Sequence, residues 1–457
     1  MSESHGISES TGRVAGRGYR RGMMAAAAVA MIGQSFALAA DRVEPATDPA
    51  IKGSLVIIGG SARFDNNELW SELLKLAGGP GSKIAVIPAA SRFPEKNGKR
   101  AVEVLNGAGA SAFFVPVAPS GLDVECQTAV NDPQLVEQVR QATGVFFIGG
   151  AQARIREALV SSSGQNSPML DAIWDVYRRG GVVAGTSAGA AIMSRVMFRE
   201  AGVVLSTMVH GVKMGKEVDH GLGFLDPAWF VDQHCLVRGR FARSLVAMQS
   251  QNVKLGIGID EDTALVVRNG HDAQVIGYRG AIVMDLTNAT CDESVAGFNL
   301  RNAKLSYLNR GDKLDLATLA VTPAPQKLAD RKIDPSSPDF KPFSGRRIFF
   351  PDILANTALT DVMRRIIDHK DGQAIGLAFD GVAALTGATP GFEFKFYRGQ
   401  DSVGWETEAF GSGDYTIQNI HLDIRPIQIK GPLYDDPTVL PDSSTPPASV
   451  AGLPLAK

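Results

Sequence analysis

The chain has 457 residues, a formal net charge of −2 and 44% hydrophobic residues. This length is sufficient for a large hydrophobic core and for more than one domain. The nearly balanced charge excludes the strongly basic surface that is typical of nucleic-acid-binding proteins, so we expect no nucleic-acid partner.

Residues 1–40 are typical of a secretory leader. Arg20 and Arg21 end a basic segment, an apolar run follows from Met23 to Ala39, and Ala37-Leu38-Ala39 matches a cleavage signal. The run has about 17 residues, fewer than the ~20 that a spanning helix needs. We therefore expect a cleaved signal peptide over 1–40, no stable membrane anchor and a secreted or periplasmic protein. The arginine pair is loosely similar to a twin-arginine signal, and the general secretory route is the alternative.

Strand and helix patterns alternate from Ser54 onward. Apolar strands are expected at 54–60, 83–91, 111–118, 144–150 and just before Ser187, with helices at 67–79, 95–107, 132–142, 151–160 and 167–181. Asp132 and Pro133 form a typical start for the third helix. This alternation predicts an α/β domain over 50–325, with a mostly parallel sheet flanked by helices on both faces, flavodoxin-like or class I glutamine-amidotransferase-like. Sites in such sheets lie at the carboxyl ends of the strands.

The pattern weakens beyond about residue 285. Residues 326–347 are polar and predict a linker, 348–430 predict a small C-terminal α+β domain, and 431–457 are rich in Pro and Ser and predict a flexible tail. Three cysteines are present, an odd number that leaves at least one thiol. The sequence contains no C-x-x-C and no H-E-x-x-H motif, so we expect no metal and no cofactor.

The segment "VVAGTSAGAAIMS" (182–194) contains a G-x-S-x-G motif between a predicted strand and a helix. Small residues allow a sharp turn that lifts the hydroxyl of Ser187 above the sheet edge, where it would be a nucleophile. The N–H of Ala188 would then point at a developing oxyanion. A plain tight turn is the alternative, whereas the absence of a following Lys excludes a Walker loop.

A serine nucleophile needs a base, and the base needs an orienting carboxylate. Of the seven histidines, His234 follows a short apolar run in "PAWFVDQHCLVRGRFAR" (227–243), although a lone His is more often a packed or surface residue. Asp260, Glu261 and Asp262 follow a predicted buried strand, and spacing alone does not choose among them. Arg238, Arg240 and Arg243 suit recognition of carboxylates, with a basic helix surface as the alternative.

Five motifs in order carry a resemblance to a known family: "GGAQ" (149–152), "GTSAGAAIMS" (185–194), "DQH" (232–234), the three arginines after it and "GIGIDEDTAL" (256–265). Over roughly residues 52–320 the chain resembles the cyanophycinases, within the serine peptidase family that also holds the aspartyl dipeptidases. The resemblance implies a triad of Ser187 as nucleophile, His234 as general acid and base, and Glu261 as orienting carboxylate.

The resemblance also implies the substrate, cyanophycin, a poly-aspartate that carries arginine on each β-carboxyl group and is cleaved from the chain end to β-Asp-Arg dipeptides. The implied pocket beside the serine consists of Gln152, Asp232, Gln233, Arg238, Arg240 and Arg243. Carboxylates of the substrate would meet the arginines, and Asp232 would receive a substrate cation. A second oxyanion donor is expected near Gly150 or Ala151.

Position 151 is Ala, where the family commonly has a polar residue. Two other functions are alternatives: an aspartyl or isoaspartyl dipeptidase with the same triad, and a non-catalytic binding protein on this scaffold. The expected partner is the polymer or its β-Asp-Arg fragments, and the resemblance makes a homodimer the default expectation.

Overall fold

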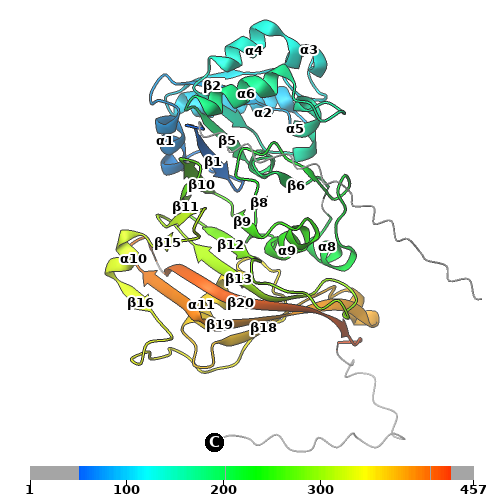
Figure 1. Ribbon diagram of the computed structural model, residues 1–457, viewed down its shortest axis with the longest axis vertical. Coiled ribbons are helices and arrows are strands. Elements are labelled where there is room, and N and C mark those ends of the chain that lie inside the picture. The colour runs from blue at the N-terminus through cyan, green and yellow to red at the C-terminus, as the bar shows by residue number, and fades with distance from the viewer. Residues whose placement is uncertain (1–50, 201, 412, 434–457) are drawn as a thin grey trace, which may run out of the picture. The chain divides into compact units, whose positions relative to one another are not determined.

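The computed structural model describes residues 51–200, 202–411 and 413–433. The predicted leader (1–40) and most of the predicted tail (431–457) lie outside the described residues. The described residues belong to one compact unit and form two nine-stranded sheets and a two-stranded one (Figure 1). In the described segments, no helix combines the length and the apolar character that crossing a membrane requires.

The first sheet has the order β15-β14-β11-β10-β1-β5-β4-β2-β3. Its five parallel strands are β1 (Ser54–Ile58), β5 (Val182–Thr186), β4 (Gly144–Phe147), β2 (Lys83–Ile87) and β3 (Ser111–Phe114). Four antiparallel strands extend it beyond β1, namely β10 (Thr263–Arg268), β11 (Asp272–Gly277), β14 (Lys313–Asp315) and β15 (Val321–Thr322). The predicted α/β class is confirmed. The order β3-β2-β4-β5 matches the first four strands of the flavodoxin-like order 2-1-3-4-5, and the fifth position beside β5 is taken by β1, which comes first in the chain. The antiparallel half was not expected.

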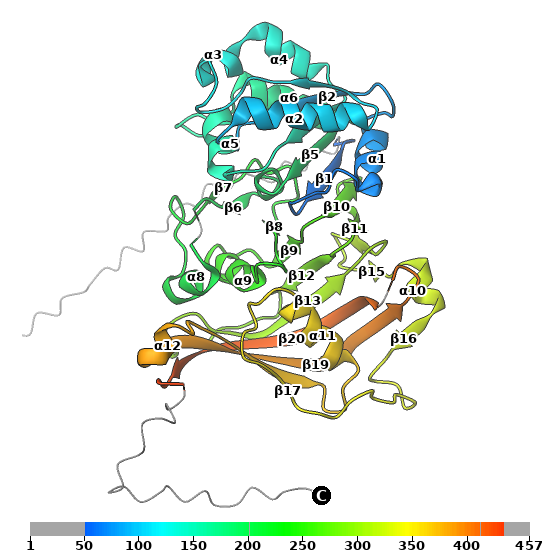
Figure 2. The ribbon, with the colours of Figure 1, turned by 180° about the vertical axis from the view of Figure 1, so that it is seen from behind.

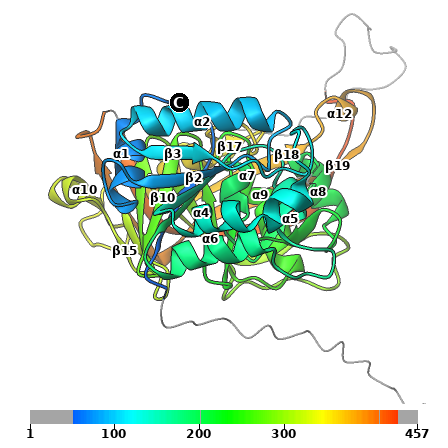
Figure 3. The ribbon, with the colours of Figure 1, turned by 90° about the horizontal axis from the view of Figure 1, so that it is seen from above.

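Helices cover both faces of the parallel strands, because alternate strand residues point to opposite faces. Leu55 and Ile57 pack in the cluster that contains the buried residues of α4, α5 and α6. Val56 and Ile58 pack in the cluster that contains those of α1 and α2. Figure 3 shows α2 and α6 on opposite sides of these strands. The helices are α1 (Asn67–Leu76), α2 (Pro94–Gly107), α3 (Cys126–Asn131), α4 (Pro133–Arg140), α5 (Gln152–Leu159) and α6 (Pro168–Arg178).

The start of α4 follows the predicted capping chemistry. The side chain of Asp132 accepts hydrogen bonds from the N–H groups of Gln134 (2.8 Å) and Leu135 (3.2 Å), and Pro133 occupies the first turn. The carboxylate thereby satisfies two of the N–H groups that a helix start leaves unpaired.

The second sheet has the order β17-β18-β19-β20-β13-β12-β9-β8 (Figure 2). It begins with β8 (Trp229–Gln233) and β9 (Leu255–Ile259), which are parallel neighbours connected through α9 (Phe241–Ser250). The others are β12 (Ala281–Asp285), β13 (Leu300–Leu308), β17 (Ile348–Phe350), β18 (Gln373–Phe379), β19 (Thr389–Thr407) and β20 (Asp414–Ile429). The remaining elements are α7 (Ala188–Ala191), α8 (Val204–His210), α11 (Ala358–Ile367), α12 (Ala383–Thr386) and the paired strands β6 (Val196–Phe198) and β7 (Val218–His220).

The region beyond residue 325 is organised differently from the expected linker and separate small domain. Strand β20 pairs with β13, so β17–β20 complete the sheet that β8 and β9 begin. The expected linker contains the end of α10 (Pro325–Ala329) and strand β16 (Arg331–Ile333), which pairs with β19. The polar composition of 326–347 does not reveal this pairing, because every non-proline residue, polar or apolar, carries a backbone N–H and C=O that can pair with another strand.

A buried ion pair holds the start of this region. Lys327 and Asp312 are fully buried, and their Nζ and Oδ2 atoms are 2.9 Å apart. Lys327 also contacts the hydroxyl of Thr416 on β20 at 3.0 Å, and that hydroxyl donates to Asp312 at 2.5 Å. These contacts connect the turn before β14 with strand β20 of the second sheet.

Candidate active site

Ser187 occupies the tight turn between β5 and α7, as the motif predicts. Its backbone has φ 54° and ψ −108°, a strained conformation of the kind that clusters at functional sites. A Cβ on Gly185 would lie 2.2 Å from the carbonyl oxygen of Gly189, and one on Gly189 would lie 2.5 Å from that of Phe147. Both glycines of the motif are therefore required by close backbone approach.

His234 follows the carboxyl end of β8, and its imidazole reaches the serine. Nε2 lies 2.8 Å from Oγ of Ser187. The backbone N–H of His234 donates to the carbonyl of Gly59 at 2.8 Å, which ties the histidine to the end of β1. A Cβ on Gly60 would lie 2.2 Å from Cε1 of the ring, so this glycine makes the space that the imidazole occupies.

Glu261 follows β9 and contacts the other ring nitrogen. Its Oε1 lies 2.6 Å from Nδ1 of His234. Because an ionised carboxylate only accepts hydrogen bonds, Nδ1 carries the proton and Nε2 is free to accept from the hydroxyl of Ser187. The neighbouring acids have other partners. Asp260 accepts from the N–H of Val237 at 3.1 Å, and Asp262 accepts from Asn66 Nδ2 at 2.9 Å.

The electrostatics favour a neutral imidazole beside an ionised carboxylate. Burial lowers the pKa of His234 below 6.5, and the charges of Arg238 and Arg240 lower it further against the opposing effect of Glu261. Burial alone would raise the pKa of Glu261, but hydrogen bonds from His234 and Ser61 and the charge of Arg238 bring it below its ordinary value. A neutral histidine can accept a proton from Ser187.

The backbone N–H groups expected to stabilise an oxyanion are those of Ala188 and of Gly150 or Ala151. Ala188 is the first residue of α7 and directly follows the serine. Gly149, which directly precedes Gly150, also lies close to the serine, because a Cβ added to Gly149 would be 3.2 Å from the Cβ of Ser187. The N–H of Ala151 already donates to the carbonyl of Ala90 at 2.9 Å, whereas in the described chain the N–H groups of Ala188 and Gly150 donate to no backbone carbonyl. Of the two expected second donors, Gly150 is therefore the available one.

Asp232 and Arg243 pair with each other inside the protein. Two hydrogen bonds of 2.8 and 2.7 Å join the guanidinium to the carboxylate, which also accepts from the hydroxyl of Ser244 and the N–H of Gln233. Both side chains are almost fully buried, with 5% of Arg243 and 2% of Asp232 exposed. The expectation that Asp232 receives a substrate cation does not fit this geometry, because four donors occupy the carboxylate. The pair instead connects β8 with α9.

The other predicted pocket residues differ in their exposure and in the hydrogen bonds that they already make within the protein. Arg240 donates to the backbone carbonyl and side-chain oxygen of Gln233, and burial together with the charge of Arg243 lowers the pKa of Arg240 to about 10. Gln152 donates to the carbonyl of Phe198 at 2.7 Å. Arg238 is half exposed, with Nη2 3.6 Å from Oε1 of Glu261. Arg238 is thus the predicted pocket residue best placed to meet a ligand.

The segment after β1 also contributes to the site, which was not expected from the motifs. Gly60 leaves room for the imidazole, and the hydroxyl of Ser61 helps to lower the pKa of Glu261. The available signal was the glycine pair that ends a buried strand in "SLVIIGGS" (54–61). Strand β1 lies next to β5 in the sheet, so its carboxyl end is beside that of the serine-bearing strand.

The three cysteines are all free thiols, and Cys235 is buried. Within the described residues, one cluster offers the ligand types that metals use: His271, Asp272 and Asp315, with ligand atoms within 4.8 Å of one another. One carboxylate oxygen of Asp315 already accepts from the N–H groups of Ala317 and Thr318. The cluster lies at the surface, at the start of β11 and the end of β14, and does not include the serine, histidine or glutamate described above.

Comparisons with known proteins match this part of the chain. The family model described as peptidase family S51 matches residues 55–276. A cyanophycinase from Nostoc sp. is 30% identical over 299 residues, which cover 64% of this chain and 95% of the relative. One from Geminocystis herdmanii is 32% identical over 275 residues, covering 59% and 95%. A crystal structure of a peptidase from an acI-B1 actinobacterium has a TM-score of 0.43 and 21% identity, covering 58% of this chain and 98% of that one.

Proposed function

The chain belongs to peptidase family S51 and is a serine-type peptidase, and from this premise we propose that it is an exopeptidase that hydrolyses cyanophycin to β-Asp-Arg dipeptides. In this proposal Ser187 is the nucleophile, His234 the general acid and base, and Glu261 the carboxylate that orients the imidazole. The single observation that carries the triad is the continuous hydrogen-bonded chain, 2.8 Å from Ser187 Oγ to His234 Nε2 and 2.6 Å from His234 Nδ1 to Glu261 Oε1.

The proposed reaction proceeds through an ester on the serine. Oγ of Ser187 attacks the scissile carbonyl carbon while its proton passes to Nε2 of His234. The carbonyl oxygen becomes an oxyanion, which the N–H groups of Ala188 and Gly150 stabilise. The imidazolium returns the proton to the leaving amine as the C–N bond breaks. Water then attacks the ester, gives a proton to His234, and releases the product acid when that proton returns to Oγ.

Two observations support cyanophycin as the substrate. The relatives from Nostoc sp. and Geminocystis herdmanii are cyanophycinases, and the chain covers 95% of each. In addition, Arg238 is half exposed beside Glu261. Each arginyl group of the polymer is attached through its α-amino nitrogen, so it keeps a free α-carboxylate, and Arg binds carboxylates well because of its planar donor geometry.

Product analysis on the purified polymer tests the substrate. We expect the wild-type protein to release β-Asp-Arg from cyanophycin, and the Ser187→Ala variant to release none. Asp-X and β-Asp-X dipeptides serve as parallel substrates. Hydrolysis of the dipeptides without release of β-Asp-Arg from the polymer would replace the proposal with an aspartyl or isoaspartyl dipeptidase.

A serine-directed covalent inhibitor tests the nucleophile independently of the substrate. We expect one adduct on Ser187, identified by mass spectrometry, and no adduct in Ser187→Ala. A folded wild-type protein that forms no adduct and cleaves none of these substrates would be a binding protein on a peptidase scaffold.

We also propose that residues 1–40 act as a secretory leader, on the basis of the basic segment, the apolar run and the Ala37-Leu38-Ala39 cleavage signal. The intact mass of the protein recovered outside the cytoplasm of a bacterial host tests this. A mass that begins near residue 40 supports the leader, and full-length protein confined to the cytoplasm contradicts it. The expected homodimer stays a prediction, which light scattering of the purified protein tests.

A further inference from the structure

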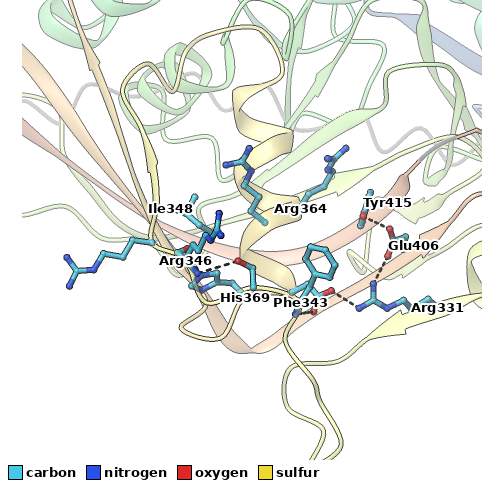
Figure 4. A pocket seen from close by; sticks show the side chains of 12 residues that line it. Arg331, Phe343, Arg346, Ile348, Arg364, His369, Glu406 and Tyr415 are labelled. Carbon is cyan, nitrogen blue, oxygen red and sulfur yellow. Dashed lines mark hydrogen bonds and ion pairs between the residues drawn. The ribbon is translucent and has the colours of Figure 1, made fainter. Parts of the chain in front are cut away.

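A pocket of about 490 Å³ lies in the region beyond residue 330, outside the residues that the family model matches. It is formed by α11, the segments before and after it, and strands β16, β17, β19 and β20. Figure 4 shows Arg346 and His369 on one side of it and Arg331, Glu406 and Tyr415 on the other, with Phe343 between them and Arg364 projecting from the helix. The volume falls within the ~300–1,000 Å³ range of small-ligand sites.

The pocket carries an excess of positive charge. Five arginines line it, against two acids. Arg331 is paired with both acids, through contacts of 2.6 Å to Asp368 and 2.8 Å to Glu406. Within the described residues, the other four arginines form no ion pair with a carboxylate. They are Arg346, Arg347, Arg364 and Arg365, and all four side chains are exposed.

The backbone that carries these arginines is anchored. The buried His369 donates from Nε2 to the carbonyl of Arg346 at 2.7 Å and accepts at Nδ1 from the N–H of Asp371 at 3.0 Å. The N–H of Phe343 donates to the carbonyl of Asp368 at 3.0 Å. These hydrogen bonds hold the segment 343–346 against the end of α11, so that the arginines before β17 and those of α11 line one pocket.

Aromatic rings contact two of these arginines, and Tyr415 and Phe343 belong to the lining. The guanidinium of Arg364 lies over the ring of Tyr415 at 5.2 Å, and that of Arg365 lies over Phe350 at 5.5 Å. Such stacking orients a guanidinium while its N–H donors stay free in the ring plane. Phe343 is 88% exposed, an unusual position for a large apolar side chain. A ligand that covers this ring and offers anions to the arginines would fit both features.

We propose that this pocket is a second binding site for cyanophycin, in which the four unpaired arginines hold arginyl α-carboxylates of the polymer and the exposed ring of Phe343 packs against its side chains. The inference rests on the proposed function, because it takes the same polymer as ligand. A site apart from the catalytic serine raises the effective concentration of an insoluble substrate without taking part in the chemistry. The repeated carboxylates of one chain suit several arginines at once.

Retention on the polymer tests the site directly. In a Ser187→Ala background, which leaves the polymer intact, the variant Arg364→Ala/Arg365→Ala is sedimented with cyanophycin granules. We expect binding about tenfold weaker or more. The control for the loss of two positive charges is Arg301→Ala/Arg425→Ala, which removes two exposed, ion-paired arginines of the same sheet that do not line the pocket. An equal loss in the control means general charge attraction and overturns the proposal, as does unchanged binding.

The lysine variant Arg364→Lys/Arg365→Lys tests whether a loss of binding could come from misfolding. It keeps the charge but not the planar donor geometry, so we expect intermediate binding with an unchanged melting temperature. Soluble polyaspartate should compete for the site and inorganic phosphate at the same charge concentration should not. Equal competition by phosphate would mean an unspecific anion site and would overturn the proposal.

Kinetics in the active enzyme separate this inference from the proposed function. We expect the alanine pair to lower kcat/KM on granules about tenfold and to leave kcat/KM on a soluble β-Asp-Arg dimer unchanged. Equal losses on both substrates contradict a second site. A wild-type protein that releases no β-Asp-Arg refutes the proposed function, whereas a wild type that releases it and alanine variants that match it refute only the pocket.

Discussion

Nδ1 of His234 lies 2.6 Å from Oε1 of Glu261, although 27 positions separate the two residues in the chain. The contact arises because β8 and β9 are adjacent parallel strands, with Gln233 paired to Ile259. The residues that follow the carboxyl ends of two such strands lie side by side. Asp262, which follows Glu261, accepts a hydrogen bond from the side chain of Asn66 and donates its backbone N–H to the carbonyl of Gly60. The serine-bearing strand β5 belongs to the other sheet, and Gly59 connects the two through its hydrogen bond from His234.

The Glu261–His234 contact predicts which acid matters for turnover. Glu261→Gln removes the charge that holds the Nδ1 proton, so kcat should fall roughly 10⁴-fold, as it does on loss of the orienting carboxylate in Ser-His-Asp triads. Steady-state hydrolysis of cyanophycin measures it. Asp260→Asn is the matched control, because its remaining oxygen can still accept from Val237. Similar losses in the two variants would contradict the special role of Glu261.

The Ser187 and His234 side chains should act as one unit. Ser187→Ala and His234→Ala are each expected to lower kcat by about 10⁴-fold or more, and the double variant should lose little beyond either single one. Active-site titration beside steady-state kinetics measures these values. Losses that multiply in the double variant would mean that the two side chains act independently.

The lowered pKa of His234 predicts the acid limb of the pH profile. Protonated imidazole cannot accept the serine proton, so kcat/KM is present above this pKa and falls as the pH drops through it. Burial, Arg238 and Arg240 place the limb below pH 6.5. Arg238→Ala removes a charge that lowers the pKa, and should move the limb to higher pH.

Salt and a conservative variant provide the control for this shift. Arg238 is half exposed, so the displacement in Arg238→Ala should shrink at high ionic strength. Arg238→Lys keeps the charge and should keep the limb near that of the wild type. A limb that stays in place or moves to lower pH in Arg238→Ala would contradict the electrostatic account.

Gly60 is predicted to be essential for a steric reason. An added Cβ would lie 2.2 Å from Cε1 of His234, so Gly60→Ala must displace the imidazole. A displacement of about 1 Å costs on the order of 10²-fold in rate. Gly164→Ala is the matched control, because Gly164 also has a positive φ of 82° but nothing within 4 Å of an added Cβ. Activity should fall in the first variant only, and equal activities would contradict the prediction.

The buried Lys327–Asp312 pair predicts a stability effect remote from the triad. Lys327→Met leaves the fully buried Asp312 without its cation, which should lower the free energy of unfolding by about 3–5 kcal/mol. Urea unfolding measures it. Lys332→Met breaks the pair with Asp334, in which the lysine side chain is 56% exposed, and should cost about 0–1 kcal/mol. Comparable losses would mean that the burial of the first pair contributes nothing.

Local patterns in the sequence predicted the parts of the fold that depend on local physics. The apolar strands, the cap at Asp132 and the turn around Ser187 follow from residue type, glycine spacing and side-chain periodicity within a few positions. The flanking helices and the α/β class follow from the same alternation. The antiparallel half of the first sheet and the pairing of β20 with β13 did not, because short apolar strands do not reveal their partners.

The sequence by itself determined a serine on a strained turn, a short set of histidine and carboxylate candidates, and a family resemblance that named one of each. Only the tertiary structure decided which groups contact one another. It paired Asp232 with Arg243 inside the protein, placed Glu261 beside His234, and brought the arginines of α11 and of the segment before β17 into one pocket. The physical reason is that these contacts depend on strand order and on the packing of segments far apart in the chain, which no local pattern of residues encodes.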